Sequence, residues 1–332
     1  MSLDVYERLR EILDAHPSGA PKSKAFAEIL RILFTDEEAE LATHMSFSPK
    51  PAHEIASACR IPLDEAEYLL ESMADKAVIF SREKDGTLSY GLLPTVPALF
   101  EFPLMRGASS PIHERLGKLW TKYRKDGLGA SFSGNSTPMA RVVPVRQAMD
   151  ATVHIHPYEE VAKLIEQADY IALGSCACSV SVVACQSPRV VCLFFDAPAR
   201  FLVDRRHARA IGREEAHSVL DRAEEAGLVH TSSNSADRAS FICNCCPCCC
   251  IILTSLTRLK LPHGFAKSGF QPQVDSEACT GCQLCAAERC PMSAIEVKND
   301  CAAVDYEKCV GCGLCVTACP AAAMTVLRRS EQ

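Results

Sequence analysis

The sequence predicts an α+β multidomain protein of 332 residues. Three observations predict this fold class. Apolar residues recur at helical spacing in the first third of the chain and are followed by a hairpin signal; short strands alternate with helices in the middle; and nineteen of the 20 cysteines follow residue 175. We expect an N-terminal helix over residues 1–20, a helical and hairpin domain over 21–105, an α/β cysteine-rich central domain over 106–265, and a small cysteine-bound domain over 270–328.

The unit at 21–105 combines four predicted helices with one predicted hairpin. Thr35 and Glu38 have the spacing of a capping box, and Asp85-Gly86 is a strong signal for a two-residue hairpin turn. The predicted elements are helices at Ala25–Leu33, after Thr35, at residues 52–59 and at Leu63–Lys76, and strands at Val78–Ser81 and Leu88–Leu92.

This order of helices followed by a hairpin resembles winged-helix domains. Such domains often bind DNA, and Leu63–Lys76 would be the recognition helix, but that helix is acidic, with Glu67, Glu71 and Asp75 among its five carboxylates. Residues 1–100 carry 10 Lys and Arg against 17 Asp and Glu, whereas DNA binding depends on neutralising phosphates. We therefore expect the unit to dock protein, or to pack within the chain. Cys59 is expected to be a small buried residue.

The central domain is expected to contain strands at Arg141–Val145 and Tyr170–Leu173 and helices at Pro157–Gln167 and Glu214–Ala226, the second ended by Gly227. His154 and His156 would share one face of a strand and could complete a metal site, although a solvated strand edge is the simpler interpretation. Among the basic residues, Arg205, Arg206, Arg209 and Arg213 form a run that is expected to be a solvated helical face, with docking of an acidic redox partner as the alternative.

Ten cysteines of the central domain are candidate metal ligands. They are Cys176, Cys178, Cys185, Cys192, Cys243, Cys245, Cys246, Cys248, Cys249 and Cys250. The simplest grouping of these ten cysteines is two four-thiolate sites with two cysteines left over. One site could use the first four and the other could draw on the run after Cys243, or each could borrow from both segments. Adjacent cysteines point opposite ways on an extended chain, so they can share a metal only if the backbone turns, as Pro247 allows.

The C-terminal domain contains two cysteine runs in tandem. The first is Cys279-x2-Cys282-x2-Cys285-x4-Cys290-Pro291, and the second is Cys309-x2-Cys312-x2-Cys315-x3-Cys319-Pro320. Three cysteines at this spacing can bind one face of a 4Fe-4S cube, and the remaining iron needs a thiolate from elsewhere in the chain. Zinc also takes four cysteines, but its sites usually use two separated pairs.

This segment resembles bacterial two-cluster ferredoxins over residues 272–328. The resemblance implies two 4Fe-4S clusters, with the fourth cysteine of each run serving the other cluster. One cluster would be bound by Cys279, Cys282, Cys285 and Cys319, and the other by Cys309, Cys312, Cys315 and Cys290. The x4 gap before Cys290, where x3 is usual, departs from the pattern. Cys301 is expected not to be a ligand, because eight are already supplied.

Composition supports metal binding over disulfides. The N-terminus has no apolar signal core, so we expect a cytoplasmic, reducing environment. Two uncharged stretches, Tyr170–Pro188 and one beginning at Ala239, are long enough to span a bilayer, but both owe their hydropathy to cysteine, so we expect no membrane span.

The whole chain resembles a group of iron–sulfur proteins of anaerobes that combine a winged-helix-like region, a Cys-x-Cys segment, a Cys-Asn-Cys-Cys run and a two-cluster ferredoxin. The resemblance implies iron–sulfur redox chemistry without a settled reaction. We expect one or two further iron–sulfur clusters in the central domain, with zinc or buried structural thiols as alternatives.

Three functions remain open from the sequence. The first is an electron-transfer protein that relays low-potential electrons between redox partner proteins and the central metal clusters. The second is an iron–sulfur oxidoreductase with its active site in the central domain, although nucleotide-binding glycine loops are absent. The third is a redox-responsive winged-helix regulator, for which DNA is an unlikely partner because the net charge is −6.

Overall fold

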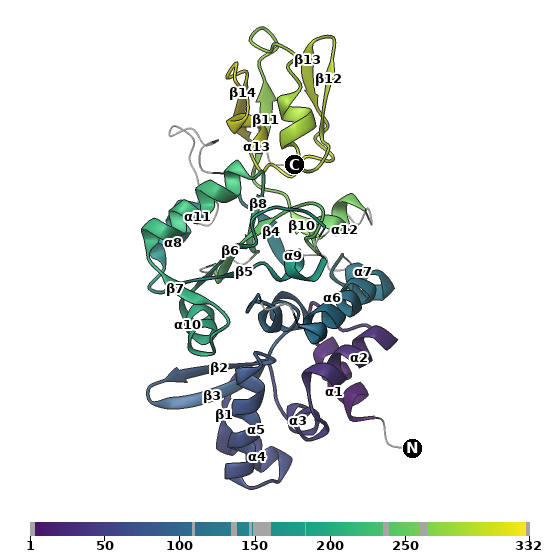
Figure 1. The fold of residues 1–332 in the computed structure, drawn as a ribbon, viewed down its shortest axis with the longest axis vertical. Coiled ribbons are helices and arrows are strands. Elements are labelled where there is room, and N and C mark those ends of the chain that lie inside the picture. The colour runs from purple at the N-terminus through teal and green to yellow at the C-terminus, as the bar shows by residue number, and fades with distance from the viewer. Residues whose placement is uncertain are drawn as a thin grey trace.

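The computed structural model describes residues 4–107, 110–133, 138–145, 148, 161–182, 184–234, 239–258 and 264–329. His154 and His156, the first residues of the predicted helix at Pro157, and the strand proposed for the two histidines lie outside these ranges. The chain folds into an elongated molecule in which the N-terminal region, the central sheet and the C-terminal region follow one another along the long axis (Figure 1). It is a mixed α+β structure with a cysteine-rich centre.

The N-terminal region consists of five helices and a three-stranded antiparallel sheet ordered β1-β3-β2. The helices are α1 (Val5–Asp14), α2 (Lys24–Leu33), α3 (Asp36–Ala42), α4 (Ala52–Cys59) and α5 (Leu63–Asp75), and the strands are β1 (Lys50–Pro51), β2 (Ile79–Lys84) and β3 (Thr87–Leu92). The predicted capping box is present, because Thr35 and Glu38 each bond the other's backbone amide. Asp85 and Gly86 both have positive φ, 52° and 74°, so the predicted hairpin turn is confirmed.

Two helices connect this region to the central sheet: α6 (Pro111–Tyr123) and α7 (Gly129–Ser133). These two helices are not predicted from the sequence, although Ser110 caps α6 and Pro111 occupies its first turn. Helix α6 packs on α2, and the rings of Phe26 and Tyr123 stack with centroids 4.5 Å apart. One continuous core therefore runs from the N-terminal helices into the central region.

The central region is a seven-stranded sheet in the order β10-β4-β8-β9-β6-β5-β7, antiparallel except for the β10–β4 pair. Its strands are β4 (Ala140–Val142), β5 (Ile171–Ser175), β6 (Val190–Phe195), β7 (Arg209–Ile211), β8 (Val229–Ser233), β9 (Phe241–Cys245) and β10 (Phe265–Ala266). Its helices are α8 (Val161–Gln167), α9 (Ala177–Val182), α10 (Asp196–Asp204), α11 (Arg213–Glu225) and α12 (Leu253–Thr257).

The predicted central elements are present with shifted ends, and the structure adds others. The strand expected at Arg141–Val145 is the shorter β4, and α11 ends before Gly227, whose φ of +71° is the left-handed conformation expected there. Strands β6, β8 and β9 are not predicted from the sequence. Strands β6 and β9 carry Cys192, Cys243 and Cys245, so the cysteine density hides their strand pattern.

The C-terminal region contains two small antiparallel strand pairs. Strands β11 (Phe270–Val274) and β14 (Met324–Arg328) bring the two ends of the region together, and β12 (Ile295–Lys298) and β13 (Cys301–Val304) form a hairpin. One short helix, α13 (Leu314–Thr317), lies within the second cysteine run. Cys301 lies at the start of β13, after a turn in which Asn299 and Asp300 have positive φ.

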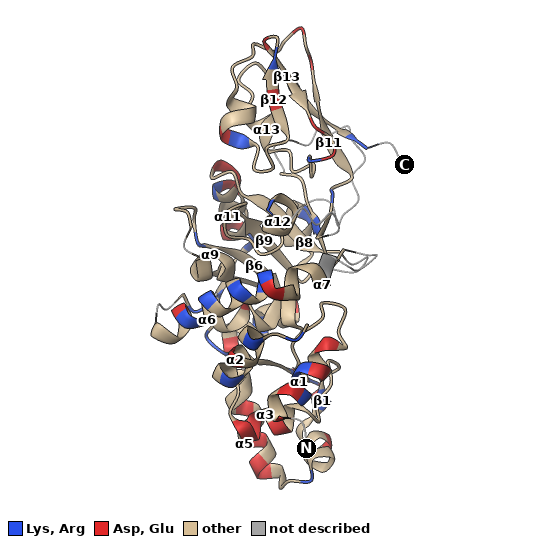
Figure 2. Ribbon diagram, turned by 90° about the vertical axis from the view of Figure 1, so that its right-hand side faces the viewer, with Lys and Arg blue, Asp and Glu red and all other residues tan. Residues whose placement is uncertain are grey.

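The basic run at residues 205–213 is not one helical face, which corrects the sequence interpretation. Helix α10 ends at Asp204, Arg209 lies on β7, and Arg213 begins α11. Two of these arginines form ion pairs within the chain. Arg205 pairs with Glu71 and Asp75 of α5, each at 2.7 Å, and Arg209 pairs with Glu215. Figure 2 shows several acidic positions, coloured red, along the ribbon of α5. Arg205 joins that acidic helix to the central region.

We expect Arg205→Ala to lower the free energy of unfolding by about 1 kcal/mol, because Glu71 and Asp75 are partly exposed and lose one shared cation. The Arg205 guanidinium lowers the pKa of Glu71, so this stabilisation is present above the ordinary carboxyl pKa and is lost as the pH falls through the lowered value. Urea unfolding at neutral and acidic pH measures both effects. Arg206→Ala is the control, and equal losses in the two variants would contradict the prediction.

Candidate metal centres

The cysteines of the C-terminal region line two separate cavities. Four line the first, here called the outer set: Cys279, Cys282, Cys285 and Cys319. Four line the second, here called the inner set: Cys290, Cys309, Cys312 and Cys315. Each set takes three cysteines from one run and the fourth from the other run. These are the same groupings that the sequence predicts, and Cys301 is not among the described residues that line either cavity.

The two sets are built in the same way. The remote cysteine of each accepts a hydrogen bond from the amide four residues later: Ala294 N donates to Cys290 Sγ at 3.2 Å, and Ala323 N donates to Cys319 Sγ at 3.3 Å. Such bonds orient the sulfur and stabilise its negative charge, which tunes the potential of a bound cluster. The additional residue before Cys290 leaves this local arrangement intact.

The sets differ in burial. Cys282 of the outer set is the one exposed cysteine among those described. In the inner set, Cys309, Cys312 and Cys315 are buried, and burial raises the pKa of the Cys312 thiol to about 12. A buried thiol with a raised pKa ionises only when a cation stabilises the thiolate, so Cys312 needs a metal to become charged.

Glycines in the two runs are required by close backbone contacts. A Cβ on Gly311 would overlap Phe270 O and Ser268 Oγ, and one on Gly281 would lie 2.8 Å from Asp300 O. Both have positive φ, +74° and +65°. The chain between the first two cysteines of each run therefore passes too close to other backbone for any larger residue.

We expect Gly311→Ala to destabilise the protein by about 2–4 kcal/mol and to lower occupancy of the inner set, since strain and overlap act together. Gly86→Ala is a matched control, because Gly86 has the same φ of +74° and a Cβ there would have nothing within 4 Å of it. The control should cost about 1 kcal/mol at most. Thermal unfolding and iron content measure the two effects, and equal effects in both variants would count against the prediction.

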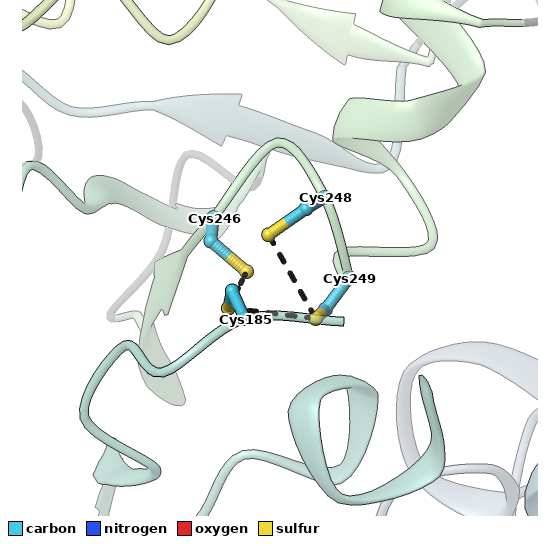
Figure 3. A group of neighbouring side chains, drawn as sticks. All are labelled: Cys185, Cys246, Cys248 and Cys249. Carbon is cyan, nitrogen blue, oxygen red and sulfur yellow. Dashed lines mark hydrogen bonds between the residues drawn. The ribbon is translucent and has the colours of Figure 1, made fainter. Parts of the chain in front are cut away.

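Four central cysteines form a compact group, here called the four-thiol group: Cys185, Cys246, Cys248 and Cys249. All four Sγ atoms lie within 4.8 Å of one another (Figure 3). Cys185 lies in the loop between α9 and β6, and the other three lie in the turn after β9. The turn is closed by a hydrogen bond from Cys250 N to Cys246 O at 3.1 Å. It brings the neighbours Cys248 and Cys249 to the same site, in agreement with the turn expected at Pro247.

The remaining central cysteines form a ring of neighbouring thiols, here called the six-thiol group. Each member lies close enough to the next to shift its pKa. In ring order the members are Cys176, Cys178, Cys250, Cys245, Cys243 and Cys192. Three come from the segment around β5 and β6, and three from β9 and the turn after it. The structure therefore has the mixed arrangement, and the set Cys176, Cys178, Cys185 and Cys192 is not brought together.

The thiols of the six-thiol group do not ionise alike. Interaction with the Cys178 and Cys192 thiols lowers the pKa of Cys176, and interaction with the Cys178 and Cys245 thiols lowers the pKa of Cys250. The other four have raised pKa values, because each interacts with neighbouring thiols of the ring and burial disfavours the thiolate. Cys176 and Cys250 are therefore the first thiolates offered to a metal.

The six-thiol group lies in the wall of a cavity of about 310 Å³ between the N-terminal and central regions. The lining is mostly apolar and aromatic, with Phe80, Phe102 and Phe194 among its members. Glu101 is the one carboxylate among the lining residues; its Oε2 accepts a hydrogen bond from Ala98 N at 2.7 Å. Burial raises the pKa of Glu101 to about 8, so the side chain can carry a proton at neutral pH.

A buried cation lies close to the ring. Arg124 is only 7% exposed, and its Nη1 donates to Thr254 Oγ1 at 2.6 Å. Burial lowers the pKa of Arg124, while charge on Cys178 and Cys250 acts in the opposite direction. A buried guanidinium close to these thiols offsets part of the charge that a thiolate site would accumulate.

The asparagine of the Cys-Asn-Cys-Cys run, Asn244, has a structural role. On β9 it points away from Cys243 and Cys245, where its Nδ2 donates to Val191 O and its Oδ1 lies in hydrogen-bond contact with His230 Nδ1. His230 Nε2 in turn contacts Glu224 Oε1 at 3.2 Å, and all three side chains are buried. Sequence reasoning misses this network, Arg124 and Glu101. The sequence offers one signal for the network: Asn244 is a single polar residue between two candidate ligands.

None of the described helices has the length and apolar character needed to cross a membrane. The two uncharged stretches fold instead as β5 with α9 and as β9 with α12.

Comparison with known families identifies one segment. Residues 302–325 match a family described as a 4Fe-4S binding domain. The match contains the second cysteine run, and the first run, with its additional residue before Cys290, lies outside it. The chain thus carries an iron–sulfur binding segment at its C-terminal end. Neither the curated proteins nor the solved structures include a match to the chain.

Proposed function

We propose that this protein transfers low-potential electrons between redox partner proteins and a metal centre in its central region. In this proposal the outer and inner sets each bind one 4Fe-4S cluster, and the six-thiol group binds a further iron–sulfur cluster. The N-terminal region is a winged-helix-like domain that packs on the central region through α5 and Arg205. Its acidic surface favours protein contacts over DNA.

The observation that carries the proposal is a shared hydrophobic core. Cys309 and Cys312 of the inner set pack in the same buried core as Cys245 and Cys250 of the six-thiol group. The contact is reinforced by a hydrogen bond from Val145 N to Cys312 O at 2.9 Å. Electron-transfer rates fall steeply with distance, so a common core between two redox centres favours transfer between them.

A second hydrophobic core connects the inner set to the outer set. Cys315 of the inner set and Cys285 of the outer set are buried in it together. The outer set includes the exposed Cys282, so a partner protein can approach this cluster most closely. The proposed order is therefore partner, outer cluster, inner cluster and six-thiol group.

Iron and acid-labile sulfide per chain, with EPR of the reduced protein, test the number of centres. We expect about twelve cluster irons, four for each cubane. About eight, with signals only from two interacting ferredoxin clusters, would contradict a cluster in the six-thiol group. Metal content at background level would contradict the whole proposal.

The order of centres is tested by mixing the oxidised protein with a reduced small ferredoxin and following each EPR signal after rapid freezing. Cys279→Ala, which removes a ligand of the outer set, should slow reduction of the remaining centres at least tenfold. Cys59→Ala, at a half-buried cysteine of α4, is the control. Reduction at an unchanged rate would show that electrons enter elsewhere.

A second candidate function is an oxidoreductase whose active site is the cavity beside the six-thiol group. The cavity favours it, because an apolar space of about 310 Å³ with one protonatable carboxyl can hold a small apolar molecule. Electrons would come from the clusters and a proton from Glu101. The test is oxidation of reduced viologen by small unsaturated, nitro and halogenated compounds. Turnover that Cys245→Ser abolishes, with ferredoxin signals retained, would establish it; no turnover by any compound would exclude these substrate classes.

A further inference from the structure

The four-thiol group has the dimensions of a site for a single metal ion. Cys185 Sγ lies 3.8 Å from Cys246 Sγ and 3.8 Å from Cys249 Sγ, and Cys249 Sγ lies 3.9 Å from Cys248 Sγ. Four sulfurs bound tetrahedrally at about 2.3 Å from one ion stand about 3.8 Å apart. These three sulfur–sulfur separations agree with that value.

A cubane requires a wider arrangement. Its four thiolates bind four different irons at the corners of a cube, so their sulfurs stand farther apart than four that share one ion. The C-terminal cysteines provide an internal comparison. All eight are described, yet among the described residues the four-thiol group alone has its ligand atoms within 4.8 Å of one another.

We propose that Cys185, Cys246, Cys248 and Cys249 bind one tetrahedral metal ion through four thiolates, and that this site is separate from every iron–sulfur cluster of the chain. Four sulfur ligands in this geometry select Zn²⁺ or a single iron. Two members are buried and two are half-buried. With all four positions taken by protein, no open position is left for substrate, which is typical of a structural ion.

The site has a definite place in the fold. The ion would tie the loop after α9 to the turn after β9, and these two segments adjoin members of the six-thiol group. Cys246 and Cys249 are sequence neighbours of Cys245 and Cys250, which belong to the other group. One ion would therefore fix the turn that adjoins three of the six thiols, without itself taking part in electron transfer.

Element-specific X-ray absorption tests the geometry on the whole anaerobically prepared protein. We expect about one zinc per chain with four sulfur neighbours at about 2.3 Å. If the ion is iron, zinc is absent and the oxidised protein shows the high-spin ferric EPR signal of one isolated iron; this outcome also supports the proposal. Zinc bound by nitrogen or oxygen, or neither metal present at this stoichiometry, overturns it.

Cys185→Ser and Cys248→Ser separate this site from the clusters. Each should lose the one ion, and the EPR signals of the two C-terminal clusters should remain. Cys59→Ser is the matched control and should lose nothing. Loss of about four irons and four sulfides with the four-thiol variants would mean that a cubane is bound there, and would overturn the proposal. If the variants do not fold, the absorption spectrum of the unaltered protein still decides the ligand set.

The failure of this proposal is distinguishable from failure of the electron-transfer function. A missing single ion leaves the cluster irons and their reduction unchanged, whereas missing clusters leave the zinc spectrum unchanged.

Discussion

Replacing Cys279 and Cys319 together by alanine is expected to remove about four irons per chain, because both belong to the outer set and one cubane is lost. Replacing Cys279 and Cys290 together is expected to remove about eight, because these two belong to different sets. The two double variants change the same number of cysteines, so they differ only in which cavities they affect. Iron and sulfide analysis of anaerobically purified protein measures the difference.

The reverse result has an equally clear meaning. If each run binds its own cluster, the pair Cys279 and Cys290 would cost about four irons and the pair Cys279 and Cys319 about eight. That outcome would contradict the crossed arrangement of the two cavities. A double variant of Cys59 and Cys301, which line neither cavity, should retain the full iron content.

Glu101→Gln is expected to change how stability depends on pH. Burial raises the pKa of Glu101 from 4.5 to about 8, so the folded protein holds a proton that the unfolded chain has lost between these two values. The contribution of this group to stability is therefore fully present below pH 4.5 and is lost as the pH rises through about 8. The complete loss is on the order of 5 kcal/mol, as an upper bound.

The glutamine variant has no such titration, and its oxygen can still accept the hydrogen bond from Ala98 N. Its stability relative to the unaltered protein should rise steadily across that pH window. Urea unfolding at several pH values measures the difference, and Glu83→Gln, at an exposed position of β2, is the control. Parallel pH profiles for Glu101→Gln and the unaltered protein would show that Glu101 is ionised at neutral pH.

The N-terminal region shows how far local signals extend. The capping box at Thr35, the hairpin at Asp85-Gly86 and the length of α5 follow from the sequence, because each depends on interactions between residues only a few positions apart. The contacts that α5 makes with the rest of the chain do not follow from the local sequence. Its acidic face pairs with Arg205, 130 residues away from Asp75, and only the folded chain brings the two charges together.

The grouping of the cysteines is likewise predictable from the sequence only in part. The spacing of the C-terminal runs places three candidate ligands in each short segment, and the resemblance to two-cluster ferredoxins implies which fourth cysteine joins each set. In the central region the alternation of side chains correctly separates Cys245 from Cys246. It does not say which cysteines from outside the run join each group: Cys176, Cys178 and Cys192 lie in the six-thiol group, and Cys185 lies in the four-thiol group.

From the sequence alone, one can locate the two cysteine runs, recognise candidate ligands for an iron–sulfur cluster, and expect an N-terminal region that is helical with one hairpin. These properties are local, set by spacing and turn chemistry. The folded chain divides the central cysteines into groups of four and six, places Glu101 and Arg124 near the larger group, and joins that group to the inner set through one core. These features do not follow from local patterns, because strand order and long-range packing depend on the free energy of the whole chain.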